Sequence, residues 1–253
     1  MSNGYGFGGE EIREESSWRY PLGIFVATLL LCAVFLYHYV GPSVDDLQGS
    51  TPNPTISEER VRITVGDRIF FVPANHTIYP KDRREKVTED LHLYAIWPTM
   101  NGYTPARRQD FTEDKPGSRR IDVQIRRRDS VFSEQQRLEQ LYLPHVVDKS
   151  GQPGDYQLTQ FTFKEARANA PTNGYAGKDM YIGEAADSEL LVLFCYKDQP
   201  DRTIPTQCYR RLDFSENVSI RYAFDRAYLP DWREIDTQVR RFIMTLTDAA
   251  GTS

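Results

Sequence analysis

Residues 21–40 read PLGIFVATLLLCAVFLYHYV, and they form the only long run in the chain without an Asp, Glu, Lys or Arg. A helix rises about 1.5 Å per residue, so some twenty residues make roughly 30 Å, the thickness of the hydrocarbon core of a bilayer. Rings suited to the membrane interfaces flank the run at Trp18 and Tyr20 on one side and at Tyr37 and Tyr39 on the other. We therefore predict one transmembrane helix over residues 21–40.

A cleaved signal, a lipoprotein signal and a soluble core helix are each less consistent with this run. A cleaved secretory signal has basic residues before a shorter apolar core and a small-x-small cleavage site, whereas Glu10, Glu11, Glu14 and Glu15 precede this run and bulky residues close it. Cys32 lacks the small preceding residue of a lipoprotein signal, so we interpret it as an ordinary membrane residue. A core helix of a soluble protein that is apolar all round needs protein on every side.

The flanking Lys and Arg residues predict the orientation of the helix. Arg13 and Arg19 lie just before the run, and no basic residue follows it until Arg60. Because Lys and Arg are retained on the cytoplasmic side, we predict a cytoplasmic N-terminus. In a Gram-negative bacterium this makes the chain an inner (cytoplasmic) membrane protein with its C-terminal part in the periplasm.

Length and composition are those of an anchor plus one globular domain. The chain has 253 residues, of which 40% are hydrophobic and 26% charged, with a formal net charge of -5. This slight acidity argues against nucleic acid as a partner. We predict a flexible cytoplasmic tail over residues 1–20, a proline-containing linker over residues 41–58 and an extracytoplasmic domain over residues 59–253.

Strand patterns dominate the predicted domain. Several stretches alternate apolar and polar residues or are continuously apolar, as strands do. Gly66 and Asp67 supply a tight turn for a hairpin between the first two strands, and residues 73–90 read as a polar loop. The predicted strands are residues 61–65, 69–72, 91–98, 121–125, 156–163, 179–182, 190–197, 208–214 and 218–224.

Helical patterns occur in two places within the domain. Ser133 and Gln136 form a helix-start signature that predicts a short helix through Leu143. Near the end of the chain, apolar residues recur at spacings of three and four, which places them on one face of a helix. These residues are Trp232, Ile235, Val239, Phe242, Ile243 and Leu246. The predicted fold class is α+β: a single N-terminal transmembrane helix, then a mostly antiparallel sheet with the C-terminal amphipathic helix packed on it.

Cys195 and Cys208 are the strongest pair with a chemical consequence. They are the only cysteines outside the apolar run, and they lie near the facing ends of two predicted strands joined by KDQPDRTIPTQ, residues 197–207. The predicted periplasmic location is oxidising, which favours a disulfide over two buried thiols in a cytoplasmic domain. Such a bridge would stabilise the domain by roughly 3 kcal/mol through loop entropy.

No arrangement typical of catalysis or metal binding is found in the sequence. His76, His92 and His145 are far apart and match no metal motif, and no G-x-S-x-G is present. We therefore predict no catalytic residue, no cofactor and no metal ligand. Only tertiary folding could bring these histidines together.

The basic segment from Arg107 to Arg128 is the best candidate contact surface. Its positive residues are Arg107, Arg108, Lys115, Arg119, Arg120, Arg126, Arg127 and Arg128. On an anchored domain such a patch can bind anionic lipid headgroups, polyanionic cell-wall material or an acidic protein. The alternative is a solvated sheet face with local salt bridges.

The anchor, the tether and the expected disulfide lead to one main functional hypothesis. We predict a single-pass, non-enzymatic protein whose periplasmic domain binds another protein, as an accessory or assembly subunit of a membrane complex. Its expected partners are the membrane and other membrane or periplasmic proteins. The alternatives are an envelope hydrolase whose site assembles only in three dimensions, and a sensor or inhibitor module that binds a small ligand or toxin.

Overall fold

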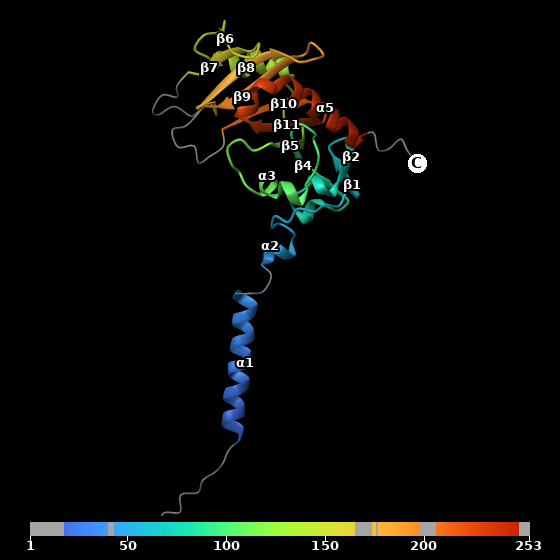
Figure 1. Ribbon diagram of the computed structural model, residues 1–253, viewed down its shortest axis with the longest axis vertical. Coiled ribbons are helices and arrows are strands. Elements are labelled where there is room, and N and C mark those ends of the chain that lie inside the picture. Colours follow the sequence, from blue (N-terminus) through green and yellow to red (C-terminus); the bar gives the residue numbers. More distant parts are fainter. Residues whose placement is uncertain (1–17, 40–42, 165–173, 176, 198–205, 248–253) are drawn as a thin grey trace, which may run out of the picture. The chain divides into compact units, whose positions relative to one another are not determined.

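The computed structural model describes residues 18–39, 43–164, 174–175, 177–197 and 206–247 (Figure 1). Most of the predicted cytoplasmic tail, residues 1–17, lies outside the described residues, as does the connection 198–205 between the two cysteine-bearing strands. The chain divides into two compact units, Met1–Gln48 and Gly49–Ser253.

The described part of the first unit contains two helices. α1 spans Arg19–Tyr39 and buries none of its residues, and α2 is a single turn at Val44–Leu47. The Ser43 hydroxyl accepts the N–H of Asp46 at 3.1 Å, which satisfies a free donor in the first turn of α2. With 21 residues and a mean hydropathy of 2.1, α1 is long and apolar enough to cross a membrane. Its length and composition fit a membrane anchor or an export signal.

The second unit is built on an antiparallel sheet of eight strands, in the order β4-β5-β11-β10-β9-β8-β7-β6. The order is not sequential, because β11 returns to lie between β5 and β10. In chain order the strands are β4 Asp90–Ile96, β5 Arg120–Arg127, β6 Gln152–Pro153, β7 Thr159–Thr162, β8 Lys178–Glu184, β9 Leu190–Tyr196, β10 Gln207–Asp213 and β11 Val218–Asp225. The apolar stretch 190–197 is thus a central strand, as predicted.

A second sheet contains the predicted hairpin. β1 (Arg60–Val65) pairs antiparallel with β2 (Arg68–Pro73), and Gly66 supplies the positive φ of 57° that the turn requires. β3 (Lys86–Thr88) pairs parallel with β1. The prediction of a plain polar loop over residues 73–90 is therefore wrong. This segment holds β3 and two 3₁₀ turns, η1 (Ala74–His76) and η2 (Pro80–Asp82), and much of it is buried.

The C-terminal helix covers one face of the large sheet. The 3₁₀ helix η6 (Arg226–Asp231) leads into α5 (Trp232–Thr247), which lies beside the β1–β2 hairpin in Figure 1. Every apolar residue predicted to form its inner face is buried in the main core. They pack with alternate residues of the strands, among them Leu91, Leu93, Ile121, Val123, Ile125, Leu191 and Leu193. The predicted α+β class with a packed C-terminal helix is confirmed.

The opposite face of the sheet is covered by short helical segments. Val192 and Phe194 alternate with the core residues of β9, so they point to the other face. There they pack under α4 (Glu134–Arg137), the π-helical turn η4 (Leu138–Tyr142) and the 3₁₀ turn η5 (Leu143–His145). Near β4, η3 (Pro105–Arg107) and α3 (Arg108–Thr112) bring Phe111 against Ile96. The capping box of Ser133 and Gln136 is present, but the predicted helix changes pitch within a turn.

A buried ion-pair network holds these layers together where β9 and β10 separate. The two strands pair only from Cys195↔Cys208 to Leu193↔Arg210. Beyond that point the Glu134 carboxylate accepts the N–H of Val192 at 3.2 Å and two N–H groups of Arg210 at 3.2 and 3.0 Å. Arg210 also donates to Asp236 of α5 at 2.6 Å. One fully buried guanidinium thus links the sheet, α4 and α5.

Candidate functional site

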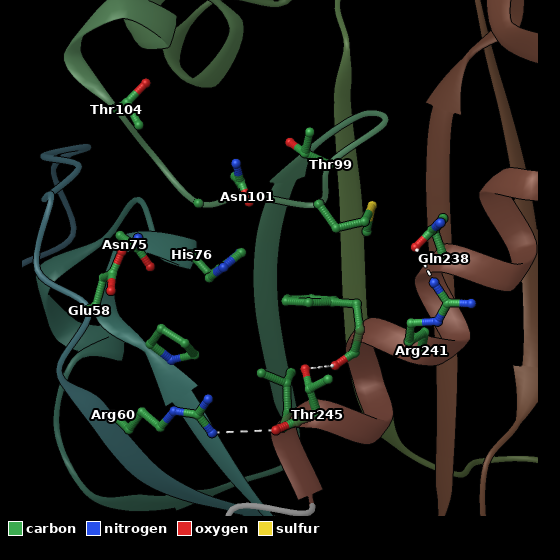
Figure 2. Close-up of a pocket in the computed structure, with 15 residues that line it drawn as sticks. Glu58, Arg60, Asn75, His76, Thr99, Asn101, Thr104, Gln238, Arg241 and Thr245 are labelled. Atoms are coloured by element: carbon green, nitrogen blue, oxygen red, sulfur yellow. Dashed lines mark hydrogen bonds between the residues drawn. The ribbon is translucent and has the colours of Figure 1, made fainter.

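A polar cavity of about 490 Å³ opens between the β1–β2 hairpin, the 97–104 loop and the last turns of α5 (Figure 2). The hairpin side contributes Glu58, Arg60, Pro73, Asn75 and His76. The loop contributes Thr99, Met100, Asn101, Gly102 and Thr104, and α5 contributes Gln238, Arg241, Phe242, Thr245 and Leu246. Segments that are distant in sequence therefore meet at one site.

Backbone hydrogen bonds fix the loop that forms the upper wall. Met100 donates its N–H to Ile96 O at 2.8 Å, and Ile96 donates to Asn101 O at 2.9 Å, which closes a tight turn after β4. Tyr103 then donates to Asn75 O at 2.7 Å, and Asn75 donates to Ser57 O at 2.8 Å. These bonds hold the loop and η1 together, so the cavity walls do not depend on side-chain contacts alone.

His76 lies in the wall as a neutral imidazole. Its Nδ1 is 2.9 Å from Tyr94 O, and its ring centroid lies 4.8 Å from that of Phe242. Burial lowers the pKa of His76 to about 4, although the hydrogen bond to Tyr94 acts in the opposite direction. Because a carbonyl oxygen only accepts, Nδ1 carries the proton and Nε2 is left as an acceptor.

Acidification is expected to destabilise the fold through His76. Its pKa in the folded state, about 4, lies below the ordinary 6.5, so the unfolded chain takes up the proton first. The contribution of this histidine is fully present above about pH 6.5 and is lost as the pH falls toward 4, by at most roughly 3 kcal/mol. Urea denaturation of the wild type and of His76→Gln at about pH 7, 5 and 4 isolates this effect. If the unfolding free energy of His76→Gln fell with decreasing pH as steeply as that of the wild type, this prediction would be contradicted.

Asn75 is a buried amide that lacks hydrogen-bonding partners. The residue is 8% exposed, its Oδ1 is buried without a partner, and its side chain makes no hydrogen bond with any described residue. A buried polar group left unpaired costs about 1–3 kcal/mol, and native structures contain few of them. The amide lies against Gly102, where a Cβ atom would come within 2.5 Å of Asn75 Cγ. Glycine at position 102 therefore leaves room for the amide.

Three charged side chains surround the opening. Arg60 donates to Thr245 O and Arg241 donates to Gln238 Oε1, both over a long 3.4 Å. Within the part of the chain that the structure describes, neither guanidinium forms an ion pair with a carboxylate. Glu58 lies on the hairpin side of the cavity (Figure 2). The lining thus combines two cations and one anion with neutral acceptors.

The arginines of the predicted contact surface lie at the two ends of β5. Arg107, Arg108, Arg119 and Arg120 lie at one end, and Arg126, Arg127 and Arg128 at the other. Arg126 follows Arg120 by six positions along the strand, which is about 20 Å. The structure therefore does not bring these arginines together into one patch.

Most of these arginines also have an acidic neighbour. The Arg120 guanidinium forms ion pairs with Asp114 and with Asp122, the latter at 2.6 Å. The remaining pairs are Arg107 with Asp110 (3.5 Å), Arg126 with Asp90 (3.6 Å), Arg127 with Glu89 (3.0 Å) and Arg128 with Asp213 (3.6 Å). Much of their charge is thus offset locally, whereas Arg108 and Arg119 are exposed.

The other two histidines of the domain lie outside the cavity. His92 is exposed on β4, with Nε2 3.3 Å from Asp90 Oδ1. His145 ends η5, and its ring centroid lies 5.9 Å from that of Tyr175. Among the described residues, no group of three or more His, Cys, Asp or Glu side chains is arranged to hold a metal ion.

The cavity was not predicted from the sequence. His76 stood out only as one of three dispersed histidines, and the segments of Asn75 and Gly102 read as connections. Arg60 and Arg241 fall within a strand and a helix, where a charged residue is ordinary. One local signal was present: Asn75 and His76 stand between Val72 and Ile78, so a polar pair is enclosed by apolar residues.

Comparison with known proteins does not show a family for this chain. No protein-family model matches it. No curated protein sequence matches it. Among solved structures it is similar to the crystal structure of the iron-regulated outer membrane lipoprotein FrpD of Neisseria meningitidis, with a TM-score of 0.47 and 12% sequence identity over 78% of this chain and 97% of that chain. A likeness this distant carries no argument about function.

Proposed function

We propose that this chain is a single-pass membrane protein whose extracytoplasmic domain binds a ligand or partner without transforming it. α1 is an uncleaved anchor in the inner membrane, with the N-terminus in the cytoplasm and the α+β domain in the periplasm. In this role the protein is an accessory or assembly subunit of a membrane complex, and the domain presents its cavity outside the cytoplasm.

The cavity is the observation that supports a binding role. Its wall offers a neutral ring nitrogen at His76, a buried amide at Asn75 and guanidinium groups at Arg60 and Arg241. A few polar groups that converge on a concave site with apolar residues in its lining are typical of ligand sites. The hydrogen-bonding capacity of these groups fits recognition of a bound molecule.

The compartment is supported by two independent features. Cys195 and Cys208 form a disulfide, and both are fully buried. Disulfides persist mainly in oxidising compartments. Arg13 and Arg19, before and at the start of α1, favour a cytoplasmic N-terminus, and the disulfide would then lie on the other side of the membrane.

Purification of the full-length chain from its own membrane in mild detergent tests the role in a complex. We expect a stoichiometric partner to remain bound. A second form, in which α1 is replaced by an unrelated transmembrane helix, shows whether the partner contacts the helix or the domain. A chain that migrates alone in both forms would contradict the accessory role, and activity of a cytoplasm-restricted reporter fused at Ser253 would overturn the orientation.

A hydrolase is the second candidate, because His76 and Glu58 line the same cavity. A general base works best with a pKa near the working pH, and a pKa of about 4 makes His76 a weak base at neutral pH. Its Nδ1 also pairs with a backbone carbonyl rather than with a carboxylate that would orient and activate it. Hydrolysis of generic ester or peptide substrates that His76→Gln abolishes would replace binding by catalysis as the function.

A further inference from the structure

The charges and acceptors of the cavity are arranged on different walls. Figure 2 shows Glu58, Asn75 and His76 together on the hairpin side, facing Gln238, Arg241 and Thr245 on α5. The Arg60 guanidinium reaches across to the last turn of α5, where it bonds to Thr245 O. The hairpin side therefore carries the one negative charge, the ring nitrogen of His76 and the Arg60 guanidinium, and the α5 side carries the Arg241 guanidinium.

The geometry points to a small zwitterion as the ligand of this cavity, a molecule that carries both an ammonium and a carboxylate, such as a free α-amino acid or a short peptide. The inference rests on the proposed binding function and names the ligand class of the same site. The carboxylate lies toward Arg241 on α5, within reach of Arg60 at the last turn of that helix, and the ammonium lies toward Glu58 and His76.

Each half of such a ligand has matching partners. Guanidinium groups present several N–H donors in a planar fork that fits a carboxylate, and each of these two uses only one long hydrogen bond. An ammonium has three N–H donors and no acceptor. The hairpin side offers the Glu58 carboxylate and the Nε2 of His76, which makes no hydrogen bond with a described residue.

The Glu58 carboxylate in the same lining argues against a simple anion as the ligand. A purely anionic ligand could pair with Arg60 and Arg241 but would be repelled by Glu58, whereas the ammonium of a zwitterion pairs with that carboxylate. An ordinary anion site on the two arginines therefore explains less of the cavity than a zwitterion does.

The remaining lining admits an apolar part of the ligand. Met100, Phe242 and Leu246 are buried residues that line the cavity. Its volume of about 490 Å³ is in the range of small-molecule sites. Both an amino acid and a short peptide have the required chemistry, so the experiment must separate these two sources.

Titration calorimetry of the full-length chain in detergent micelles, with a panel of matched probes, tests the inference. The panel contains free amino acids with small and large apolar side chains, dipeptides of the same residues, and the N-acetyl and C-terminal amide forms of each. We expect the zwitterions to bind and both blocked forms to bind at least about tenfold more weakly. Whether the amino acid or the dipeptide binds more tightly identifies the source.

Variants assign the two ends of the ligand. Glu58→Gln should weaken binding of the zwitterion about tenfold and remove the preference over the N-acetyl form, and Arg241→Gln should remove the preference over the amide form. Glu59→Gln and Arg68→Gln are matched controls, because both side chains are exposed on the same hairpin region and do not line the cavity. The controls should bind as the wild type does.

Two outcomes overturn the inference. In the first, no zwitterion of the panel binds at millimolar concentration. In the second, the blocked forms bind as tightly as the parent compounds, or the control variants lose as much affinity as Glu58→Gln. If a stoichiometric membrane partner is nevertheless recovered, the proposed function stands and only the ligand class is wrong.

Discussion

Replacement of Arg210 by methionine is expected to lower the free energy of unfolding by about 3–5 kcal/mol. The Arg210 side chain is fully buried and donates to Glu134, to Asp236 and to Leu190 O. Burial disfavours its charge, but the neighbouring carboxylates, with Glu134 first, more than offset this and raise the pKa of Arg210. Methionine fills similar space but leaves the Glu134 carboxylate without its cation, and it leaves the buried Asp236 with Arg240 as its remaining ion-pair partner at 3.0 Å.

Arg211→Met is the matched control for this prediction. Arg211 is the next residue on β10, so its side chain lies on the other face of the strand, where it pairs with the exposed Asp129. Exposed ion pairs contribute about 0–1 kcal/mol, so this variant should unfold almost as the wild type does. Urea denaturation of both variants provides the comparison. Equal losses of unfolding free energy in the two variants would show that the buried Arg210 network stabilises the fold no more than the Arg211 pair does.

Removal of the disulfide by the double change Cys195→Ala and Cys208→Ala is expected to cost about 3 kcal/mol of stability. The two residues are directly paired across β9 and β10 and are separated by 13 positions in sequence. The bridge therefore closes a short loop in the unfolded chain and limits the conformations open to it. Both sulfur atoms also belong to the main core, so two alanines bury less apolar surface.

The cysteine of α1 provides the control for the disulfide. Cys32 is exposed and carries a free thiol, so Cys32→Ala should leave urea denaturation unchanged. Addition of reductant to the wild type should reproduce most of the loss seen in the double variant and should have no effect on that variant. A double variant as stable as the wild type would show that the cross-strand packing around β9 and β10 is sufficient without the bond.

Much of the fold could be predicted because its signals are local. The alternation of Ile121, Val123 and Ile125 marks a strand with one buried face, whatever lies against it. The apolar residues of the last helix, from Trp232 to Leu246, repeat with helical spacing and are buried as predicted. A short turn at Gly66 fixes the register of the hairpin. In the strand and the helix, the spacing of the apolar residues along the chain is enough to predict which face of the element packs against the core.

Other parts could not be predicted, because polar residues were buried by distant segments. Residues 74–78 are polar enough to read as a surface loop, yet β4, the 97–104 loop and α5 enclose them. Arg210 stands next to Arg211 in the sequence of its strand, and nothing near it in sequence indicates that Glu134 and Asp236 will meet its guanidinium. The arginines near β5 looked like one patch because spacing along the chain does not show which carboxylates lie opposite.

The sequence by itself determined the run 21–40 that fits a membrane span, the strand and helix periods of the domain, and the positions of its two paired cysteines. These properties depend on neighbours along the chain and on hydrophobicity. Only the tertiary structure decided that Arg210 is the buried link between sheet and helices, and that Glu58, Asn75, His76 and Arg241 surround one cavity. Such arrangements arise from packing between distant segments, since burial and pairing of a polar side chain depend on what the fold places beside it.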